Sequence, residues 1–365
     1  MKGGFLNMDI DSLREKIDKI DEKIVCLLNK RYENVLQIGK LKHASSKDIY
    51  VPEREKSLIN RLLKINKGPM TENALKSIYR EIMSGAIALE HPIKIGFPSD
   101  NLSFAKYAGI KKFGVNIKNI EFSSISEVFK SIQNGKINYG IVPVENSQTG
   151  VIYETFDAVL EYDSIICAEE YVTSHFSLMA NSDNIDSLSS IYLTASVFSI
   201  CSEWIKSNLK EEKIILVKDI NEIFPFLKNN DSIGIISDTF VGNAHNLITL
   251  AENIENSENI VTRFLILGKQ KTKPTGDDKT SILLLIEDRA GALSDVFYCF
   301  KKNDVPVTFL ETRPSKIGNW KYYFFIDFIG HTDDDKCALL INELKNICTS
   351  FRVIGSYPKA SFNSN

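Results

Sequence analysis

The sequence contains no long apolar run, no basic tract and no paired cysteines. No stretch approaches the roughly 20 apolar residues of a membrane-spanning helix, and the first residues show no apolar core of signal-peptide length. The six cysteines and five histidines are dispersed, without a Cys-x-x-Cys pair or metal-ligand spacing. With a net charge of −3, nothing favours nucleic-acid binding. We therefore expect a cytoplasmic protein with free thiols and no membrane, nucleic-acid or metal partner.

The composition is that of a globular protein, with 43 % hydrophobic and 25 % charged residues. A length of 365 residues predicts two or three domains. The longest regular pattern runs from Met8 to Lys42, where apolar residues recur at steps of three and four and no glycine occurs before Gly39. This spacing predicts a long amphipathic helix.

Cations interrupt the apolar stripe of this helix. Arg31 follows Leu27 by four residues, and Lys42 follows Ile38 at the same spacing. One such cation is commonly a long side chain at the edge of an apolar face, whereas two in one stripe favour an anionic site. Arg14, beside the stripe, would lie roughly 25 Å from Arg31 along the helix axis. A shared site would therefore need Arg14 from a second copy, in a two-fold dimer of antiparallel helices.

Two shorter helices are predicted after a polar stretch. Pro52 begins the second helix, and a break at residues 67–69 precedes a third helix that Thr71 would cap. Several cations and a few carboxyl groups, with no nucleophile, suit a small dicarboxylate and catalysis by positioning and electrostatics. The inward-facing charged side chains of this all-α unit are Arg14, Arg31, Lys42, Arg54, Glu55 and Glu90.

The segments LREKIDKIDEKIVCLLNKR, IGKLK, PEREKSLINRL and REIMSGAIALE resemble the all-helical chorismate mutase family. The resemblance implies rearrangement of chorismate to prephenate. It implies that Arg31, Arg54 and Arg14 of a partner copy bind the substrate carboxylates. It also implies that Lys42 and Glu90 bind the ether oxygen, and that Glu55 binds the ring hydroxyl. Val51 and Ala86 depart from residues found in some members, and neither change removes a central cation.

From Pro92 onward, apolar strands alternate with helical segments. This alternation predicts an α/β region with mostly parallel sheets, arranged as two lobes around a cleft. Ligands of such folds bind at strand carboxyl ends and helix N-termini. The predicted strands are residues 93–97, 139–144, 165–169, 175–180, 190–194, 214–218 and 232–237, with helices that include 126–134 and 197–208.

Two motifs in this region place polar groups at strand ends. Residues 143–150 read PVENSQTG, and residues 259–267 read NIVTRFLIL. The first alone is equally consistent with a polar loop and a helix cap. Together with LAENI at 250–254 they resemble the prephenate dehydratase family, which has a two-lobed, periplasmic-binding-protein-like fold. The resemblance implies that Thr262 hydrogen-bonds the departing hydroxyl, and that the substrate is bound by Glu145, Asn146, Ser147, Arg263 and Phe264.

Two segments depart from the dehydratase pattern. Residues 97–103 lack the glycines and threonine of Gly-Pro-x-Gly-Thr-Phe-Ser. In the Ser-His-x-x-x-x-x-Gln-Cys segment, the serine, histidine and glutamine become Leu193, Thr194 and Ile200. Three hypotheses stay open for this domain: an active dehydratase, a degenerate domain that couples phenylalanine sensing to the mutase, and altered chemistry such as decarboxylation without aromatisation. The retained Thr262 argues against the last.

The remaining chain follows a polar linker predicted at residues 269–279. Its βαββαβ order predicts a ferredoxin-like fold. A plain helix start and strand end would also explain its two motifs, but the order of the domains disfavours that explanation. The motifs resemble the phenylalanine-binding segments of the ACT regulatory family, and consist of Gly291, Ala292, Leu293 and Ser294, and of Glu311, Thr312, Arg313 and Pro314.

The three predicted domains span residues 8–91, 92–270 and 279–360. Their order resembles the bifunctional chorismate mutase/prephenate dehydratase family. The resemblance implies conversion of chorismate through prephenate to phenylpyruvate, with phenylalanine as feedback inhibitor and no metal or organic cofactor. It also implies a homodimer or a higher homo-oligomer. A protein that only binds ligands is disfavoured, because the helical unit keeps its full cationic set.

The carboxyl group of Glu90 can donate a hydrogen bond to the ether oxygen only when it is protonated. We therefore expect mutase activity to increase as the pH falls. The measurement is the rate of chorismate consumption across a pH series. A rate that rises toward alkaline pH would contradict this role of Glu90.

Overall fold

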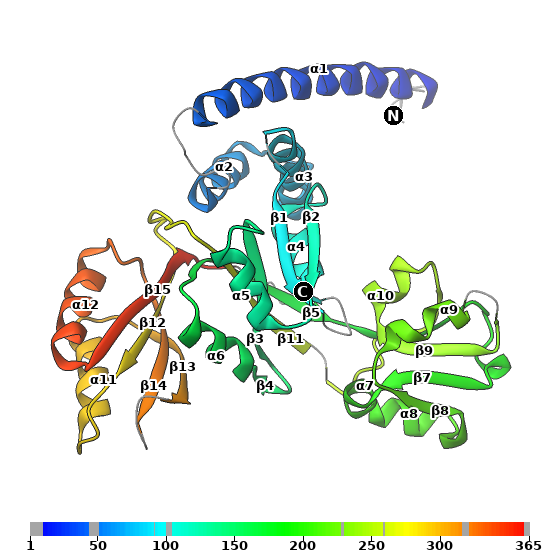
Figure 1. The fold of residues 1–365 in the computed structure, drawn as a ribbon. Helices are drawn as coiled ribbons and strands as arrows, with labels where there is room; N and C mark the ends of the chain where they lie inside the picture. The colour runs from blue at the N-terminus through cyan, green and yellow to red at the C-terminus, as the bar shows by residue number, and fades with distance from the viewer. Residues whose placement is uncertain are drawn as a thin grey trace, which may run out of the picture. The chain divides into compact units, whose positions relative to one another are not determined.

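The computed structural model describes most of the chain, in two compact units (Figure 1). The described residues are 10–43, 51–90, 92–99, 104–227, 230–257, 260–315 and 321–360, without the side chains of Lys42, His43, Glu90, Asn243 and Ala244. The first unit comprises the described parts of residues 1–51, 58–93 and 113–117. The second comprises the described parts of residues 52–57, 94–112 and 118–365.

The first unit is helical, as predicted. Its helices are α1 (Ile10–His43), residues 58–65 of α2 (Pro52–Ile65), and α3 (Glu72–Glu90). Thr71 caps α3, because its Oγ1 accepts a hydrogen bond from the backbone N–H of Ala74 at 3.2 Å. The C-terminal half of α1 packs on α3, and the Tyr32 hydroxyl donates to the carbonyl of Ile82 at 3.3 Å.

The N-terminal half of α1 is uncovered in the single chain. Every residue from Ile10 to Leu27 is exposed. The apolar stripe lies in this part, and Ile10, Ile17 and Leu27 are 65 %, 56 % and 64 % exposed. Most helices in proteins are stable because an apolar face packs against something else. A stripe of this length in water therefore marks a surface that needs a partner.

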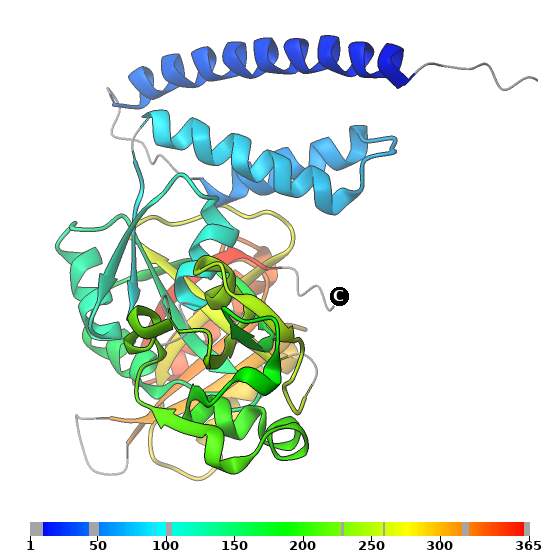
Figure 2. The ribbon, with the colours of Figure 1, turned by 90° about the vertical axis from the view of Figure 1, so that its right-hand side faces the viewer.

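Two sheets form the framework of the second unit (Figures 1 and 2). The larger runs in the order β13-β14-β12-β15-β5-β11-β3-β1-β2, with β4 paired to β3, and the smaller runs β10-β6-β9-β7-β8. The strands of the larger sheet are β1 (Lys94–Pro98), β2 (Lys118–Phe122), β3 (Tyr139–Asn146), β4 (Gly150–Val151), β5 (Ile165–Ser174), β11 (Ile260–Gly268), β12 (Asp278–Leu285), β13 (Val307–Pro314), β14 (Tyr322–Ile329) and β15 (Ser350–Pro358). Those of the smaller are β6 (Phe176–Ala180), β7 (Ser190–Thr194), β8 (Ile214–Val217), β9 (Ile233–Asp238) and β10 (Ile248–Ala251).

Helices accompany each part of this framework. The first lobe has α4 (Phe104–Phe113), α5 (Ile125–Gln133) and α6 (Tyr153–Glu161); the second lobe has α7 (Ala195–Ile200), α8 (Ser202–Asn208), α9 (Phe224–Leu227) and α10 (Thr239–Ala244). The prediction of one helix over 197–208 is wrong, because the segment is divided at Cys201. There the carbonyl of Ile200 accepts from the backbone N–H of Asn256 at 2.8 Å, while Asn256 Oδ1 accepts from the N–H of Glu203 at 3.0 Å.

The expectation of mostly parallel sheets is only partly correct. β1 pairs in parallel with β2 and β3, and β7 with β8 and β9. However, β11 is antiparallel to both β3 and β5, and β6 is antiparallel to β9 and β10. The reason is that the chain changes sheets: β5 leads into β6 through His175, and β11 returns it to the larger sheet.

The C-terminal part confirms the predicted βαββαβ order, as β12, α11 (Ala292–Lys302), β13, β14, α12 (Asp335–Ile347) and β15. The linker prediction is wrong at its end, since Asp278 and Lys279 are buried in β12. These strands continue the sheet of the first lobe where β15 lies beside β5. A Cβ atom on Gly355 would lie 2.3 Å from the carbonyl oxygen of Ile166, so glycine permits this approach.

Candidate active sites

The two predicted dehydratase motifs meet where β3 and β11 pair. Thr262 lies opposite Asn146 in the antiparallel register, and Asn146 Nδ2 donates to Thr262 Oγ1 at 2.8 Å. An amide nitrogen can only donate, so the hydroxyl hydrogen of Thr262 remains available for another acceptor. Two segments 116 residues apart in the sequence thus form one polar pair.

The turn after β3 is held by the same asparagine. Asn146 Oδ1 accepts from two backbone N–H groups of the turn, at 2.9 and 3.1 Å. Ser147 fastens the turn to β11, because its N–H donates to the carbonyl of Val261 at 2.9 Å and its Oγ accepts from the N–H of Val261 at 3.0 Å. The position of the Thr262 hydroxyl therefore depends on this turn.

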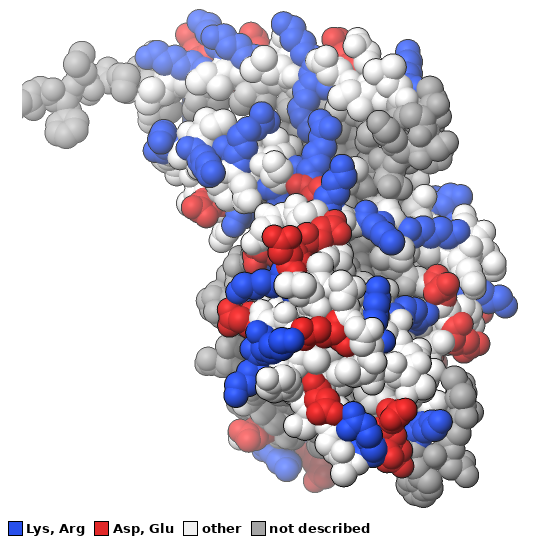
Figure 3. Space-filling view, turned by 90° about the vertical axis from the view of Figure 1, so that its left-hand side faces the viewer, with Lys and Arg blue, Asp and Glu red and all other residues white. Residues whose placement is uncertain are grey.

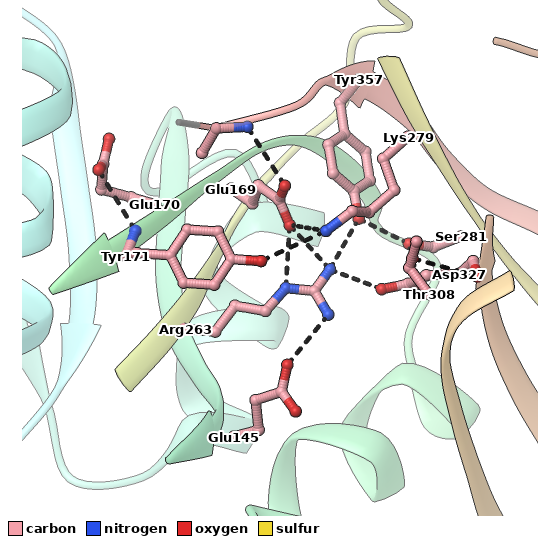
Figure 4. Close-up of polar contacts among 11 residues, drawn as sticks. Glu145, Glu169, Glu170, Tyr171, Arg263, Lys279, Ser281, Thr308, Asp327 and Tyr357 are labelled. Carbon is pink, nitrogen blue, oxygen red and sulfur yellow. Dashed lines mark hydrogen bonds and ion pairs between the residues drawn. The ribbon is translucent and has the colours of Figure 1, made fainter. Parts of the chain in front are cut away.

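Arg263 and Thr262 are successive residues of β11, so their side chains project from opposite faces of the strand. Figure 4 shows the polar groups around Arg263. The Arg263 side chain is buried, with Nε 2.9 Å from Glu169 Oε2 and Nη2 2.6 Å from Asp327 Oδ2. Burial by itself would lower the pKa of Arg263, but Asp327, Tyr357 and Glu169 raise it well above the usual value. The guanidinium is thus a permanent buried cation.

The predicted substrate-binding residues occupy different environments. Asn146 and Ser147 border the turn, and Glu145 is 37 % exposed with its Oε1 at 3.5 Å from Arg263 Nη1. Phe264 is buried at 1 % exposure and Arg263 at 2 %. Direct contact of these five side chains with a substrate stays a prediction. Burial disfavours such contact for Arg263 and Phe264.

Sequence reasoning missed the charged groups around Arg263. Lys279 Nζ donates to Glu169 Oε2 at 2.8 Å, and Asp327 reaches the guanidinium from β14. These three residues are buried. The available signal was a charge inside an apolar strand, as in YYFFIDFI, because such a charge needs a buried partner.

The residues that depart from the dehydratase pattern lie in the second lobe. Leu193 is fully buried in the apolar core of that lobe, and Ile200 packs against the same core. Thr194 caps α7, with Oγ1 accepting from the N–H of Val197 at 3.4 Å. Leu193 therefore fills core space in this protein. In the other departing segment, residues 100–103 lie outside the described part of the chain.

In the first unit, the Nη1 atom of Arg31 is buried and has no hydrogen-bond partner among the described residues. An anion bound beside Arg31 would supply this partner. Arg14 is largely exposed and lies 3.2 Å from Asp11. Lys and Arg side chains predominate over Asp and Glu on one face of this unit (Figure 3). An anionic ligand would be attracted to such a surface.

The other predicted mutase residues are Arg54, Glu55, Lys42 and Glu90. Arg54 and Glu55 lie in the part of α2 that belongs to the second unit, so the predicted set is described in two parts. The side chains of Lys42 and Glu90 lie outside the described residues. The roles of these four residues stay predictions.

One predicted regulatory motif borders a cavity of about 310 Å³ in the C-terminal part. Gly291 precedes α11 with φ +84°, in the left-handed region that favours glycine. The backbone N–H groups at the start of α11 can therefore face an anion. The lining residues include Arg289, Gly291, Ala292, Leu293, Lys321 and Tyr322.

The second regulatory motif faces a different part of the molecule. Glu311, Thr312, Arg313 and Pro314 end the edge strand β13 and are not among the described residues that line this cavity. Arg313 instead donates two hydrogen bonds to the carboxylate of Asp157 on α6, at 2.8 and 2.7 Å. Its guanidinium also lies 4.7 Å from the ring centre of Tyr153. In one chain, the two motifs do not form one pocket from the residues described.

Three further observations concern metals, thiols and membranes. The described residues contain no group of three or more His, Cys, Asp or Glu placed to hold a metal ion. All six cysteines are free, as predicted. Among the helices that the structure describes, none has the length and apolar character to cross a membrane.

These features define a class of multidomain protein: a helical unit, a two-lobed α/β unit with a polar pair at the ends of two strands, and a βαββαβ unit. The family model described as chorismate mutase type II matches residues 13–91, and the one described as prephenate dehydratase matches residues 95–272. The bifunctional chorismate mutase/prephenate dehydratase of Aquifex aeolicus (strain VF5) is 35 % identical over 96 % of this chain and 98 % of that protein. That of Pseudomonas aeruginosa is 33 % identical over the same shares. The chain belongs to the bifunctional chorismate mutase/prephenate dehydratase family, as predicted.

A solved structure supports the fold of the second unit. A prephenate dehydratase from Arthrobacter aurescens, in complex with L-Phe, is 24 % identical with a TM-score of 0.66. The match covers 73 % of this chain and 90 % of that chain. At this identity the likeness shows the fold alone.

A buried carboxyl group lies at the junction of the two lobes. Asp238 ends β9, and its Oδ1 accepts from the backbone N–H of Phe240 at 2.8 Å. Burial raises the pKa of Asp238 from 3.8 to about 6, against the opposing effect of backbone hydrogen bonds from Phe240 and His175. The folded protein therefore binds a proton here more tightly than the unfolded chain does.

This pKa predicts a pH-dependent stability. The contribution is favourable at low pH and is lost as the pH rises from 3.8 to about 6, which costs about 1 to 3 kcal/mol above that range. Asp238→Asn keeps an oxygen acceptor but stays neutral. It should raise the midpoint of thermal unfolding at about pH 8 and change it little at about pH 4. Equal shifts at both pH values would contradict the assignment.

Proposed function

We propose that this protein is a cytoplasmic enzyme that rearranges chorismate to prephenate in its helical domain and converts prephenate to phenylpyruvate in its α/β domain. The three domains would span residues 8–91, 92–270 and 279–360. The proposal rests on the Asn146–Thr262 pair. Asn146 Nδ2 lies 2.8 Å from Thr262 Oγ1, so the two dehydratase motifs are in direct contact. Family membership supports the same pair of reactions.

The dehydratase step removes carbon dioxide and the ring hydroxyl of prephenate together. The electron pair of the breaking C–C bond completes the aromatic ring, and the hydroxyl on the para carbon leaves as hydroxide with the electron pair of the breaking C–O bond. Thr262, whose oxygen accepts from Asn146, would donate its hydroxyl hydrogen to the departing oxygen. A threonine is too weak an acid to give up its proton unaided, so its contribution is to polarise the leaving group, directly or through a water.

The mutase step breaks the ether C–O bond of chorismate while a C–C bond forms. No nucleophile is needed, so charge and positioning supply the catalysis. The unsatisfied Nη1 of Arg31 is suited to a substrate carboxylate. In this proposal Arg54 of the same chain and Arg14 of a partner copy also bind the substrate carboxylates. Lys42 and Glu90 face the ether oxygen, and Glu55 binds the ring hydroxyl.

The same helix supports a dimer. The exposed apolar stripe of α1 needs cover, and a second α1 running antiparallel would provide an equally apolar surface. Arg14 and Arg31 of one chain lie roughly 25 Å apart along the helix. An antiparallel partner brings its own Arg14 toward Arg31, so that each mutase site uses both chains.

Phenylalanine would act at the C-terminal domain, which we propose to be an ACT domain. Gly291, Ala292 and Leu293 border a cavity. The backbone N–H groups at the start of α11 can bind a carboxylate in this cavity. The edge strand β13, which carries Glu311, Thr312, Arg313 and Pro314, is available for pairing with a second copy. An effector bound between two such domains would favour one arrangement of the dehydratase lobes.

A mixing experiment tests the shared mutase site. Arg14→Ala and Arg31→Ala should each lose most mutase activity, because each removes a carboxylate contact. Co-expressed, they should recover about one quarter of the wild-type rate, since half of the dimers are mixed and each mixed dimer has one intact site. Each variant expressed alone is the control. No recovery in proven mixed dimers would contradict a site shared between chains.

A product analysis tests the dehydratase site. Given chorismate, the wild-type protein should form phenylpyruvate, whereas Thr262→Ala should accumulate prephenate, with a loss of about 100-fold or more in the second step. Thr262→Ser keeps the hydroxyl and should retain much of the activity. Phenylpyruvate formation at the wild-type rate by Thr262→Ala would contradict the role of Thr262. Intact prephenate with the wild-type protein would support the degenerate-domain hypothesis instead.

A further inference from the structure

A cluster of buried polar side chains surrounds Arg263 (Figure 4). Arg263 projects from the face of β11 opposite to that of Thr262, which belongs to the predicted dehydratase site. None of the clustered residues is more than 6 % exposed. They come from both the α/β part and the C-terminal part of the chain. We call these residues the Arg263 cluster: Glu169 of β5, Arg263 of β11, Lys279 and Ser281 of β12, Asp327 of β14 and Tyr357 of β15.

The members of the cluster form a connected network, which also reaches Glu145 through Arg263 Nη1 at 3.5 Å. Arg263 Nη2 donates to Asp327 Oδ2 at 2.6 Å and to the Tyr357 hydroxyl at 3.2 Å. Ser281 Oγ joins these two acceptors, at 2.5 Å from Asp327 Oδ1 and 2.7 Å from the Tyr357 hydroxyl. Glu169 accepts from Arg263 Nε at 2.9 Å and from Lys279 Nζ at 2.8 Å. Two buried cations thus face two buried carboxylates, and the guanidinium is fixed from several directions.

The place of Arg263 in the strand connects this network to Thr262. The two residues are adjacent but project from opposite faces of β11. The pairing of β11 with β3 changes register between Arg263 and Phe264, so the ladder is interrupted immediately after Arg263. On the β3 side, backbone pairing therefore supports this point less, whereas the pairing of β11 with β5 continues through it without a shift. The side-chain anchor at Arg263 fixes the strand directly beside the residue that meets Asn146.

We propose that Glu169, Lys279 and Asp327 are positioning residues for the dehydratase reaction. They hold the guanidinium of Arg263, and through the backbone of β11 they hold the Thr262 hydroxyl against Asn146. Arg263 acts from behind the strand and does not touch the substrate. Because Lys279 and Asp327 belong to the C-terminal strands, that domain takes part in shaping the dehydratase site. The inference rests on the proposed role of Thr262.

The test uses the full-length protein and two isosteric substitutions, Asp327→Asn and Glu169→Gln. Each leaves the catalytic pair intact but removes one charge that holds Arg263. The dehydratase kcat for prephenate should fall about tenfold or more, because small misplacements of a reacting group are costly. KM should change less than about threefold, since no substrate contact is lost. Mutase activity on chorismate, measured on the same samples, should stay unchanged.

The matched control is Glu170→Gln. Glu170 follows Glu169 in β5 but pairs with Lys111 of α4 at 3.0 Å, on the other face of the strand. This variant should keep its dehydratase kcat within about twofold of wild type. An equal loss in Glu170→Gln, or an unchanged kcat in both cluster variants, would overturn the proposal. A rise in KM at constant kcat would also overturn it, because it would indicate a binding role.

A milder variant and a reference variant complete the test. If a charge substitution prevents folding, Ser281→Ala removes only the hydroxyl that supports Asp327 and Tyr357. It should lower kcat by several-fold with little change in KM; no change would overturn the proposal. Thr262→Ala separates this inference from the proposed function. If Thr262→Ala is inactive while the cluster variants are normal, only the positioning role fails.

Discussion

The buried guanidinium of Arg263 is the interaction on which the arrangement of the second unit depends. A buried cation is tolerated only when carboxylates compensate it, and removing one partner of such a pair typically costs about 3 to 5 kcal/mol. Here the compensating groups, Glu169 of β5 and Asp327 of β14, come from strands that have β12 and β15 between them in the sheet. The lobe and the C-terminal domain must therefore fold onto one another around this charge.

Two other contacts join the first lobe to the C-terminal domain. Gly355 allows β15 to approach β5 closely, which makes the sheet continuous between the two parts. On the other side, Arg313 holds Asp157 and covers Tyr153 in the first turn of α6. That helix follows the turn organised by Asn146. The C-terminal domain therefore contacts the surroundings of the dehydratase pair at α6 as well as at the strands behind Thr262.

Local pattern was enough to predict the elements, and much of the site, from the sequence. Periodicity identified α1, and the family resemblance singled out Thr262 and Asn146, although their contact depends on strand pairing across 116 residues. The face of β11 that carries Arg263 depends on register, which the sequence does not specify, so the burial of Arg263 and its charged partners could not be predicted. Leu193 was likewise read as a lost polar group, whereas the lobe uses it as core.

The two proposed active sites differ in what completes them. The Asn146–Thr262 pair is formed within one chain, by strands that the same chain holds in place. In the helical unit, the apolar stripe of α1 is exposed and Arg31 Nη1 has no partner among the described residues. In our proposal a second copy covers the stripe and an anionic substrate binds Arg31. Association would then matter for the first reaction through the site itself, and for the second reaction through the C-terminal domain, by way of the contacts that this domain makes with Arg263 and α6.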